Sequence, residues 1–213
     1  MRGKLITLEG GEGAGKSTVL AAIRDRLGEH GIAHAVTREP GGTPLGEGVR
    51  ELVLGAHLGG QVCAESELLL MFAARAQLVR EVFLPALGAG TWIVSDRYVD
   101  ASYAYQGAGR GQPVDRIAAL EEWACAGVRA DLTLLLDLPV EQGLSRANQR
   151  GAADRIESEQ ADFFERIRAG YRERAAAEPD RIRVIDSSRT IEQVRDDVLS
   201  ALDAFVALAG NAA

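Results

Sequence analysis

Short apolar runs alternate with longer segments of mixed polarity along the whole chain. The runs have the length and composition of β-strands, and they lie at 5–9, 33–37, 91–95, 132–138 and 183–185. The run at 132–138 is interrupted only by Thr133 and Asp137, which is typical of a parallel strand covered on both faces. Five strands are therefore predicted.

The segments between these runs predict helices. In 17–30 the apolar residues Val19, Leu20, Ile23 and Leu27 recur at helical spacing. Further helices are predicted over 45–54, 65–87, 114–126, 140–149, 159–177 and 191–208. Because strands that alternate with helices form parallel sheets, we predict an α/β fold in which a five-stranded parallel sheet lies in a three-layer α/β/α sandwich.

The chain has the length of one well-buried domain, and 1–213 shows neither an internal repeat nor a low-complexity linker. Its formal net charge of −7 argues against a general nucleic-acid binder, which needs a basic face to neutralise phosphates. The longest purely apolar run, 68–74, is too short to cross a membrane, and the apolar pattern at the start ends too early for a signal peptide. With two cysteines and no metal-ligand spacing, we expect a cytoplasmic domain without nucleic-acid or membrane partners.

Residues suited to chemistry follow three of the predicted strands, at 10–17, 38–43 and 96–98. Ligands of parallel α/β sheets bind at the carboxyl ends of the strands. We therefore expect these three clusters to meet at one edge of the sheet.

The cluster at 10–17 has the spacing G-x-x-x-x-G-K-[ST] between a strand and a helix, which indicates a P-loop that binds phosphates. Backbone N–H groups and the start of the helix would face the phosphates, Lys16 would reach the β- and γ-phosphates, and the Ser17 hydroxyl would ligate Mg²⁺. The predicted ATP-binding residues are Gly10, Gly11, Glu12, Gly13, Ala14, Gly15, Lys16, Ser17 and Thr18. A glycine-rich turn without a ligand is the alternative. A dinucleotide-binding motif fails because Lys16 occupies its third glycine position.

Other motifs separate the classes of P-loop protein. No N-K-x-D sequence is present, which argues against a GTPase, and no strand ends in the acidic pair usual in motor ATPases. Of the 24 basic residues, 22 are Arg, and guanidinium groups neutralise anionic phosphates through directional contacts. Arginines that could act on phosphates follow strands (Arg38, Arg97), follow the apolar run 68–74 (Arg75), or flank the bend at 151–154 (Arg146, Arg150, Arg155). These features favour a small kinase.

Five ordered motifs together make the chain resemble the bacterial thymidylate kinases over about 5–185. They are the P-loop, Thr37-Arg38-Glu39-Pro40-Gly41-Gly42-Thr43, Phe72-Ala73-Ala74-Arg75, Asp96-Arg97-Tyr98 and Ala104-Tyr105-Gln106-Gly107. The resemblance implies a P-loop fold with a small lid, transfer of phosphate from ATP to dTMP with Mg²⁺ in dTTP synthesis, and a homodimer. It implies a monophosphate-binding region at about 38–110 and a lid at about 146–157.

The resemblance also assigns residues to the substrate. Arg38 and Arg97 would bind the dTMP phosphate, Arg75 the thymine edge, and Glu12 would lie near the sugar 3′-hydroxyl and the reacting phosphates. Ser102 and Gln106 would contact the base, with Tyr105 beside them, and Glu39-Pro40 would shape the monophosphate pocket. The position from which relatives stack a Phe on thymine holds Met71 here, followed by Phe72, so that either one could face the base.

Members of this family differ in where the catalytic arginine lies. The P-loop position that is basic in some members is Gly13 here, whereas basic residues gather at the bend, as in the type with a lid arginine. Arg150 is the first candidate for this arginine and Arg155 the second.

We expect in-line transfer without a covalent enzyme intermediate and without a strong general base, because the phosphate of dTMP is already ionised. Lys16, Arg97 and Arg150 would hold the migrating group, and Asp96 would act through Arg97 or the metal shell. A deoxynucleoside kinase, another nucleoside monophosphate kinase and a non-enzymatic nucleotide switch are the alternative functions.

Overall fold

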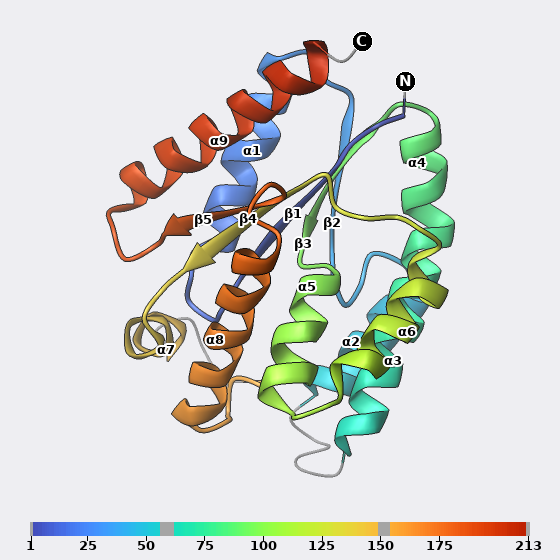
Figure 1. The fold of residues 1–213 in the computed structure, drawn as a ribbon, viewed down its shortest axis with the longest axis vertical. Helices are drawn as coiled ribbons and strands as arrows, with labels where there is room; N and C mark the ends of the chain where they lie inside the picture. The colour runs from blue at the N-terminus through green and yellow to red at the C-terminus, as the bar shows by residue number, and fades with distance from the viewer. Residues whose placement is uncertain (1, 56–61, 149–153, 212–213) are drawn as a thin grey trace.

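A single five-stranded sheet forms the centre of the computed structural model, which describes residues 2–55, 62–148 and 154–211 (Figure 1). The strands are β1 (Leu5–Gly10), β2 (His34–Arg38), β3 (Trp92–Asp96), β4 (Leu132–Asp137) and β5 (Ile182–Asp186). Their order is β2-β3-β1-β4-β5, and every neighbouring pair is parallel. The predicted parallel sheet is confirmed, and no strand end differs from its predicted position by more than one residue.

Helices connect the strands and lie on both faces of the sheet. They are α1 (Lys16–Glu29), α2 (Pro44–Leu54), α3 (Ala64–Leu78), α4 (Leu84–Gly88), α5 (Val99–Ser102), α6 (Val114–Cys125), α7 (Val140–Asn148), α8 (Ala161–Ala177) and α9 (Ile191–Asn211). Among the described residues, none of these helices combines the length and apolar content needed to cross a bilayer.

Two π-helical segments depart from the predicted pattern. The helix expected over 65–87 is α3, then a π-helical segment at Val79–Phe83, then α4. A second π-helical segment, Tyr103–Gly109, continues α5 in a region for which no helix was predicted. Its glycines and alanines lack a helical apolar pattern, but they allow α8 to approach closely: a Cβ on Gly109 would lie 2.8 Å from Phe163.

The alternating side chains of the strands divide the core into layers. Ile6 and Leu8 of β1 pack with α1 and α9 on one face of the sheet, whereas Leu5 packs with the helices on the other face. Figure 1 shows α1 and α9 side by side on that first face, with α3, α6 and α8 opposite. Glu9 of β1 also faces the second layer, where Tyr171 of α8 donates a hydrogen bond to it.

The carboxyl ends of the strands bring the three motif clusters together at one edge of the sheet, as predicted. The chain leaves β1 into the P-loop, β2 into 38–43 and β3 into 96–98, and all three clusters contribute to one cavity. Thr43 then caps α2 by accepting a hydrogen bond from the Gly46 N–H at 3.0 Å, so the helix begins directly beside this edge.

Candidate active site

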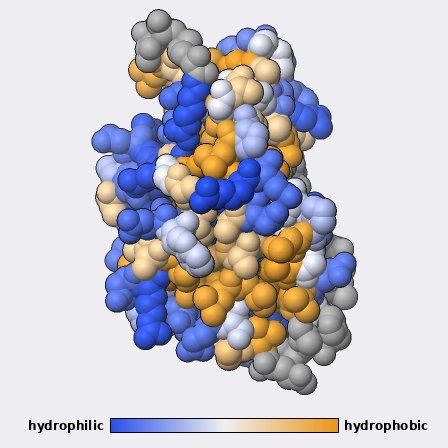
Figure 2. All heavy atoms as spheres, turned by 90° about the vertical axis from the view of Figure 1, so that its right-hand side faces the viewer, coloured by the Kyte–Doolittle hydropathy of each residue, from blue (hydrophilic) through white to orange (hydrophobic). Residues whose placement is uncertain are grey.

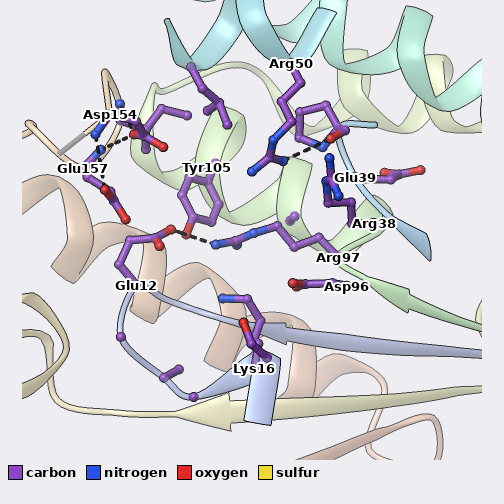
Figure 3. A pocket seen from close by; sticks show the side chains of 18 of the residues that line it. Glu12, Lys16, Arg38, Glu39, Arg50, Asp96, Arg97, Tyr105, Asp154 and Glu157 are labelled. Carbon is purple, nitrogen blue, oxygen red and sulfur yellow. Dashed lines mark hydrogen bonds and ion pairs between the residues drawn. The ribbon is translucent and has the colours of Figure 1, made fainter. Parts of the chain in front are cut away.

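A cavity of about 430 Å³ opens at the carboxyl edge of the sheet. The P-loop and the start of α1 line one end of the cavity. The chain at the ends of β2 and β3 lines another part of it. Residues from α2, α3, the π-helical segment 103–109 and the chain after α7 complete it (Figure 3). The site therefore combines a phosphate loop with a second, chemically different lining.

The P-loop has the backbone that its glycines allow. Gly13 and Gly15 have φ angles of 71° and 89°, a region that favours glycine, and α1 begins at the next residue, Lys16. The Lys16 Nζ donates to the carbonyl oxygens of Gly10 and Gly11 at 3.0 and 3.1 Å. Burial and the nearby Arg97 lower the pKa of Lys16 from its ordinary value. An anionic phosphate in this loop would stabilise its charged form.

Arg97 occupies the middle of the cavity, directly after β3. Its guanidinium donates to Glu12 Oε1 at 2.7 Å and to the carbonyl oxygen of Gly10 at 3.2 Å, and it lies 4.6 Å above the ring centre of Tyr105. Tyr105 in turn donates its hydroxyl hydrogen to Glu12 Oε1 at 2.8 Å. Burial disfavours the charge, but neighbours that include Glu12 and Asp96 outweigh it and raise the pKa of Arg97. The structure thus brings the predicted residues Glu12, Arg97 and Tyr105 into one charged cluster.

A buried carboxyl group lies behind this cluster. Glu9 accepts hydrogen bonds from the Tyr98 backbone N–H and from the Tyr171 hydroxyl, each at 2.7 Å, and Tyr171 also accepts one from Arg97 at 3.2 Å. Burial, together with the nearby Asp100, raises the pKa of Glu9 to about 8, against the opposing effect of Arg97. Glu9 therefore reaches Arg97 through a tyrosine of α8. Sequence reasoning missed this connection, because only the fold brings β1 and α8 together.

Arg38 and Arg50 bring positive charge to the end of the cavity beyond β2. Arg38 pairs with Glu47 at 2.8 Å, and half of its side chain is exposed. Arg50, one helical turn after Glu47 on α2, donates to the Pro40 carbonyl oxygen at 3.1 Å. Arg38 was predicted from its motif, but Arg50 was missed because no motif marks it. The only feature of the sequence that could have indicated Arg50 is its position one turn after Glu47 on a helix that begins at this edge.

The structure does not bring Arg75 to the surface of the cavity. Its side chain is fully buried and donates to Glu39 Oε2 at 2.8 Å, to Ser102 Oγ at 2.9 Å and to the Tyr98 carbonyl oxygen at 3.1 Å. Arg75 and Ser102 are therefore not part of the cavity lining; Ser102 holds Arg75, and Arg75 in turn holds Glu39, which does line the cavity. Their contact with a base stays a prediction.

Met71 and Phe72 have different surroundings. Met71 lines the cavity, whereas Phe72 is buried with its ring 4.5 Å from the guanidinium carbon of Arg75. Of the two, Met71 is therefore the residue that the cavity exposes to a ligand. Gln106 lines the cavity as well, and Glu39 and Pro40 complete this part of the lining.

The predicted lid is described only at its two ends. Arg150, the first candidate for the catalytic arginine, lies outside the described residues. Arg155, the second candidate, is buried away from the cavity, where it pairs with Glu67 and donates to the Val53 carbonyl oxygen at 2.6 Å. In this structure Arg155 joins the chain at this end of the predicted lid to α2 and α3. Asp154, Ile156 and Glu157 next to it do line the cavity, as does Arg146 of α7 at the other end of the predicted lid.

The residues near Ser17 fit a partly hydrated Mg²⁺. Ser17 and Asp96 line the same cavity, and Asp96 Oδ1 is buried without a hydrogen-bond partner among the described residues. Mg²⁺ usually binds one or two protein oxygens and completes its shell with waters and substrate phosphates. In the described part of the chain, no group of three or more His, Cys, Asp or Glu residues could hold a metal alone. The donors fit a metal bound together with a phosphate.

The fold and the site together define a P-loop phosphotransferase: a parallel sheet whose first strand leads into a phosphate loop, with arginines at the ends of the next two strands in the same cavity. Comparison with known proteins gives the family. The family model described as Thymidylate kinase matches residues 8–198.

Individual relatives agree along almost the whole chain. The thymidylate kinase of Chromobacterium violaceum is 52% identical over 202 residues, which cover 95% of this chain and 94% of the relative. That of Methylococcus capsulatus is 53% identical over 205 residues, with 96% and 97% covered, and that of Pseudomonas putida is 51% identical over 206 residues, with 97% and 98% covered. The chain belongs to the thymidylate kinase family.

Proposed function

We propose that this enzyme transfers the γ-phosphoryl group of ATP to the phosphate of dTMP and releases ADP and dTDP. One observation carries the proposal: the P-loop and the lining formed by Arg38, Met71 and Gln106 share one cavity, with Arg97 between them. A triphosphate on the loop and a nucleoside monophosphate against the second lining would meet at Arg97. The family to which the chain belongs supports dTMP as the acceptor.

The P-loop side of the cavity would hold ATP. Its backbone N–H groups and the N-terminus of α1 face the phosphates, and Lys16 moves its ammonium from the loop carbonyls to the phosphate oxygens. Ser17 and Asp96 would hold Mg²⁺, which would supply positive charge to neutralise the phosphates.

Arg97 would neutralise the two reacting groups as they approach. Its φ of 71° turns the residue sharply at the end of β3, and Glu12 and Tyr171 hold its guanidinium across the cavity. Because the guanidinium is already in place, the site need not rearrange during the reaction. Such prior positioning of charge is the main way in which sites for phosphoryl transfer lower the barrier. Because the phosphate of dTMP is ionised at neutral pH, no residue needs to remove a proton from the acceptor.

The monophosphate would bind between β2 and α3. Arg38 and Arg50 carry the charge suited to its phosphate, while Met71 offers an apolar surface and Gln106 an amide to the base. We further propose that Arg150 completes the charge neutralisation when the lid closes over ATP, and that closure excludes water.

A panel of acceptors tests the function. With ATP and Mg²⁺, release of ADP is measured with dTMP, thymidine, AMP, GMP and dCMP. We expect dTMP to give the highest kcat/KM by about a hundredfold or more, because the lining offers both anion-binding and base-binding groups. Turnover with thymidine alone would instead indicate a deoxynucleoside kinase, and ATP binding without turnover a nucleotide switch.

We also propose that the enzyme is a cytoplasmic homodimer. Figure 2 shows apolar side chains gathered over the face formed by α3 and α6, and Leu69 and Trp123, which lie on these helices, are 58% and 80% exposed. Exposed apolar surface of this kind favours association with a second copy. The two free cysteines, Cys63 and Cys125, are typical of a reducing compartment.

A further inference from the structure

The amide of Gln106 is held in one orientation by a buried carboxylate. Gln106 Nε2 donates to Glu67 Oε1 at 3.0 Å, and each of these two residues is 1% exposed. The other amide atom, Gln106 Oε1, is buried and has no hydrogen-bond partner among the described residues. The side chain lines the cavity, so its carbonyl is the group left for a ligand.

The charge of Glu67 decides which atom of the amide faces it. Arg155 pairs with Glu67 Oε2, and Arg110 approaches both carboxylate oxygens at 3.4 Å. Burial raises the pKa of Glu67, but the bonds from Arg155 and Gln106 and the charge of Arg110 outweigh it and lower the pKa below its ordinary value. An ionised carboxylate only accepts hydrogen bonds. The amide must therefore present its NH₂ group to Glu67 and its carbonyl elsewhere.

A buried carbonyl without a partner favours a ligand that donates a hydrogen bond. Among pyrimidines, thymine and uracil carry hydrogen on ring atom N3, whereas cytosine has a lone pair there. We propose that Glu67 determines the base selectivity of this site by fixing the Gln106 amide with its carbonyl toward the base, so that N3–H pyrimidines are accepted and cytosine is rejected. The inference rests on the proposed function and names the residue behind its base preference.

Glu67 is itself fixed from two sides. Arg155 lies at the end of the lid and is tied to α2 by its backbone N–H, which donates to the Leu54 carbonyl oxygen at 3.1 Å. Arg110 follows the π-helical segment that carries Gln106, and it pairs with Glu159 before α8. Both cations come from chain segments next to the cavity. The orientation of the amide is therefore set by the folded site and does not depend on the ligand.

The test compares acceptors in the wild type and in Glu67→Gln. Replacing the carboxylate removes the constraint, because an amide at this position can donate or accept and Gln106 can then turn its NH₂ group to the base. We expect the ratio of kcat/KM for dTMP to that for dCMP to fall by at least about tenfold. The ratio for dTMP to dUMP should stay unchanged, because both bases carry N3–H. Equal dTMP:dCMP ratios in the wild type and the variant would overturn the proposal.

Two further variants separate selectivity from damage to the fold. Glu67→Asp keeps an acceptor-only carboxylate and should keep the dTMP:dCMP ratio of the wild type, even where its kcat is lower. In the background of Gln106→Ala, adding Glu67→Gln should leave the ratio unchanged, because Glu67 acts through Gln106. Loss of selectivity in Glu67→Asp, or a further loss in the double variant, would contradict the proposal.

The wild type provides the independent check on the proposed function. If it does not phosphorylate dTMP, the proposed function fails. If it does so and the Glu67 variants keep their selectivity, only the inference on Glu67 fails.

Discussion

Arg97 joins the two halves of the site at the scale of single residues. Its guanidinium meets a carboxylate of the P-loop, a tyrosine hydroxyl of α8 and a backbone carbonyl oxygen of the P-loop at Gly10 within hydrogen-bond distance. The planar guanidinium reaches these three acceptors from two separate nitrogens in fixed directions, whereas the donors of an ammonium all lie on one atom. The position therefore requires more than a positive charge.

Replacing Arg97 with lysine should expose this requirement. We expect kcat to fall by about 10²–10³, the range seen when one stabilising donor is removed from a preorganised site. The matched control is Arg24→Lys on the outer side of α1, where an exposed pair with Asp25 contributes little. Steady-state kinetics and thermal melts of both variants provide the measurement. An Arg97→Lys enzyme with the kcat of the control would contradict this role.

Glu9 gives the site a pH-dependent stability. Burial raises its pKa from 4.5 to about 8, with Asp100 acting in the same direction, while Arg97, Tyr171 and the Tyr98 N–H act in the opposite one. The folded state thus keeps a proton that the unfolded chain loses. The stability that the folded protein gains from keeping Glu9 protonated is fully present below about pH 4.5 and is lost as the pH rises toward 8.

The free energy of unfolding of the wild type should therefore fall between pH 5 and 8. In Glu9→Gln, which cannot ionise, we expect this fall to be smaller by more than about 1 kcal/mol. Urea unfolding at several pH values measures how the free energy of unfolding changes with pH in the wild type and in the variant. Identical slopes would show that the charge of Glu9 is not linked to folding.

The sequence predicts residues that belong to contiguous motifs, and it misses those that only the fold brings together. Lys16, Arg38 and Arg97 follow strands directly, so their convergence follows from the parallel sheet alone. Glu67 and Tyr171 lie inside helices, where a carboxylate or a tyrosine is commonplace. Their roles depend on partners 88 and 162 residues away along the chain.

Two glycines allow close contact between the P-loop and α7 at the scale of elements. A Cβ on Gly13 would lie 2.1 Å from the carbonyl oxygen of Gly143, and one on Gly143 would lie 2.5 Å from that of Glu12. Both contacts are with backbone, which cannot move aside as a side chain can. This gives a physical reason why the P-loop here holds glycine where some members of the family hold a basic residue.

Gly143→Ala should therefore destabilise the protein by about 1–3 kcal/mol, as expected for overpacking. Gly48 provides a matched control, because it lies inside α2 with nothing within 4 Å of an added Cβ. There the same change should stabilise by about 0.5–1 kcal/mol, because alanine favours helix. Equilibrium unfolding in urea compares the two. Similar effects in both variants would contradict the close approach of P-loop and α7.

The elements also show where pattern reasoning reaches its limit. The five strands and most helices follow from apolar periodicity, but the π-helical segment Tyr103–Gly109 does not. Four of its seven residues are glycine or alanine, and it is packed against α8, so that tertiary packing and not local pattern determines it. The segment nevertheless carries Tyr105 and Gln106, two residues of the cavity.

At the scale of the whole molecule, the proposed dimer is expected to form through the outer face of α3 and α6. If this face binds a second copy, Leu69→Asp and Trp123→Asp should each convert a dimer into monomers, because a charge would be buried in an apolar interface. Leu208→Asp is the matched control: Leu208 is 70% exposed but lies on α9, on the opposite side of the sheet.

Sedimentation velocity gives the oligomeric state of each variant. We expect the Leu208 variant to stay dimeric. A dimer that persists in the α3 and α6 variants, or a monomeric wild type, would contradict the proposed interface.

In the proposed function, one cavity brings ATP and dTMP together for direct transfer. The most direct measurement follows the label from ATP that carries ³²P in the γ-phosphate, with Mg²⁺ and either dTMP or thymidine as acceptor. We predict that the label appears in dTDP, that its appearance depends on dTMP, and that little is released as inorganic phosphate. Label in inorganic phosphate with no labelled dTDP, or label transferred to thymidine and not to dTMP, would contradict it.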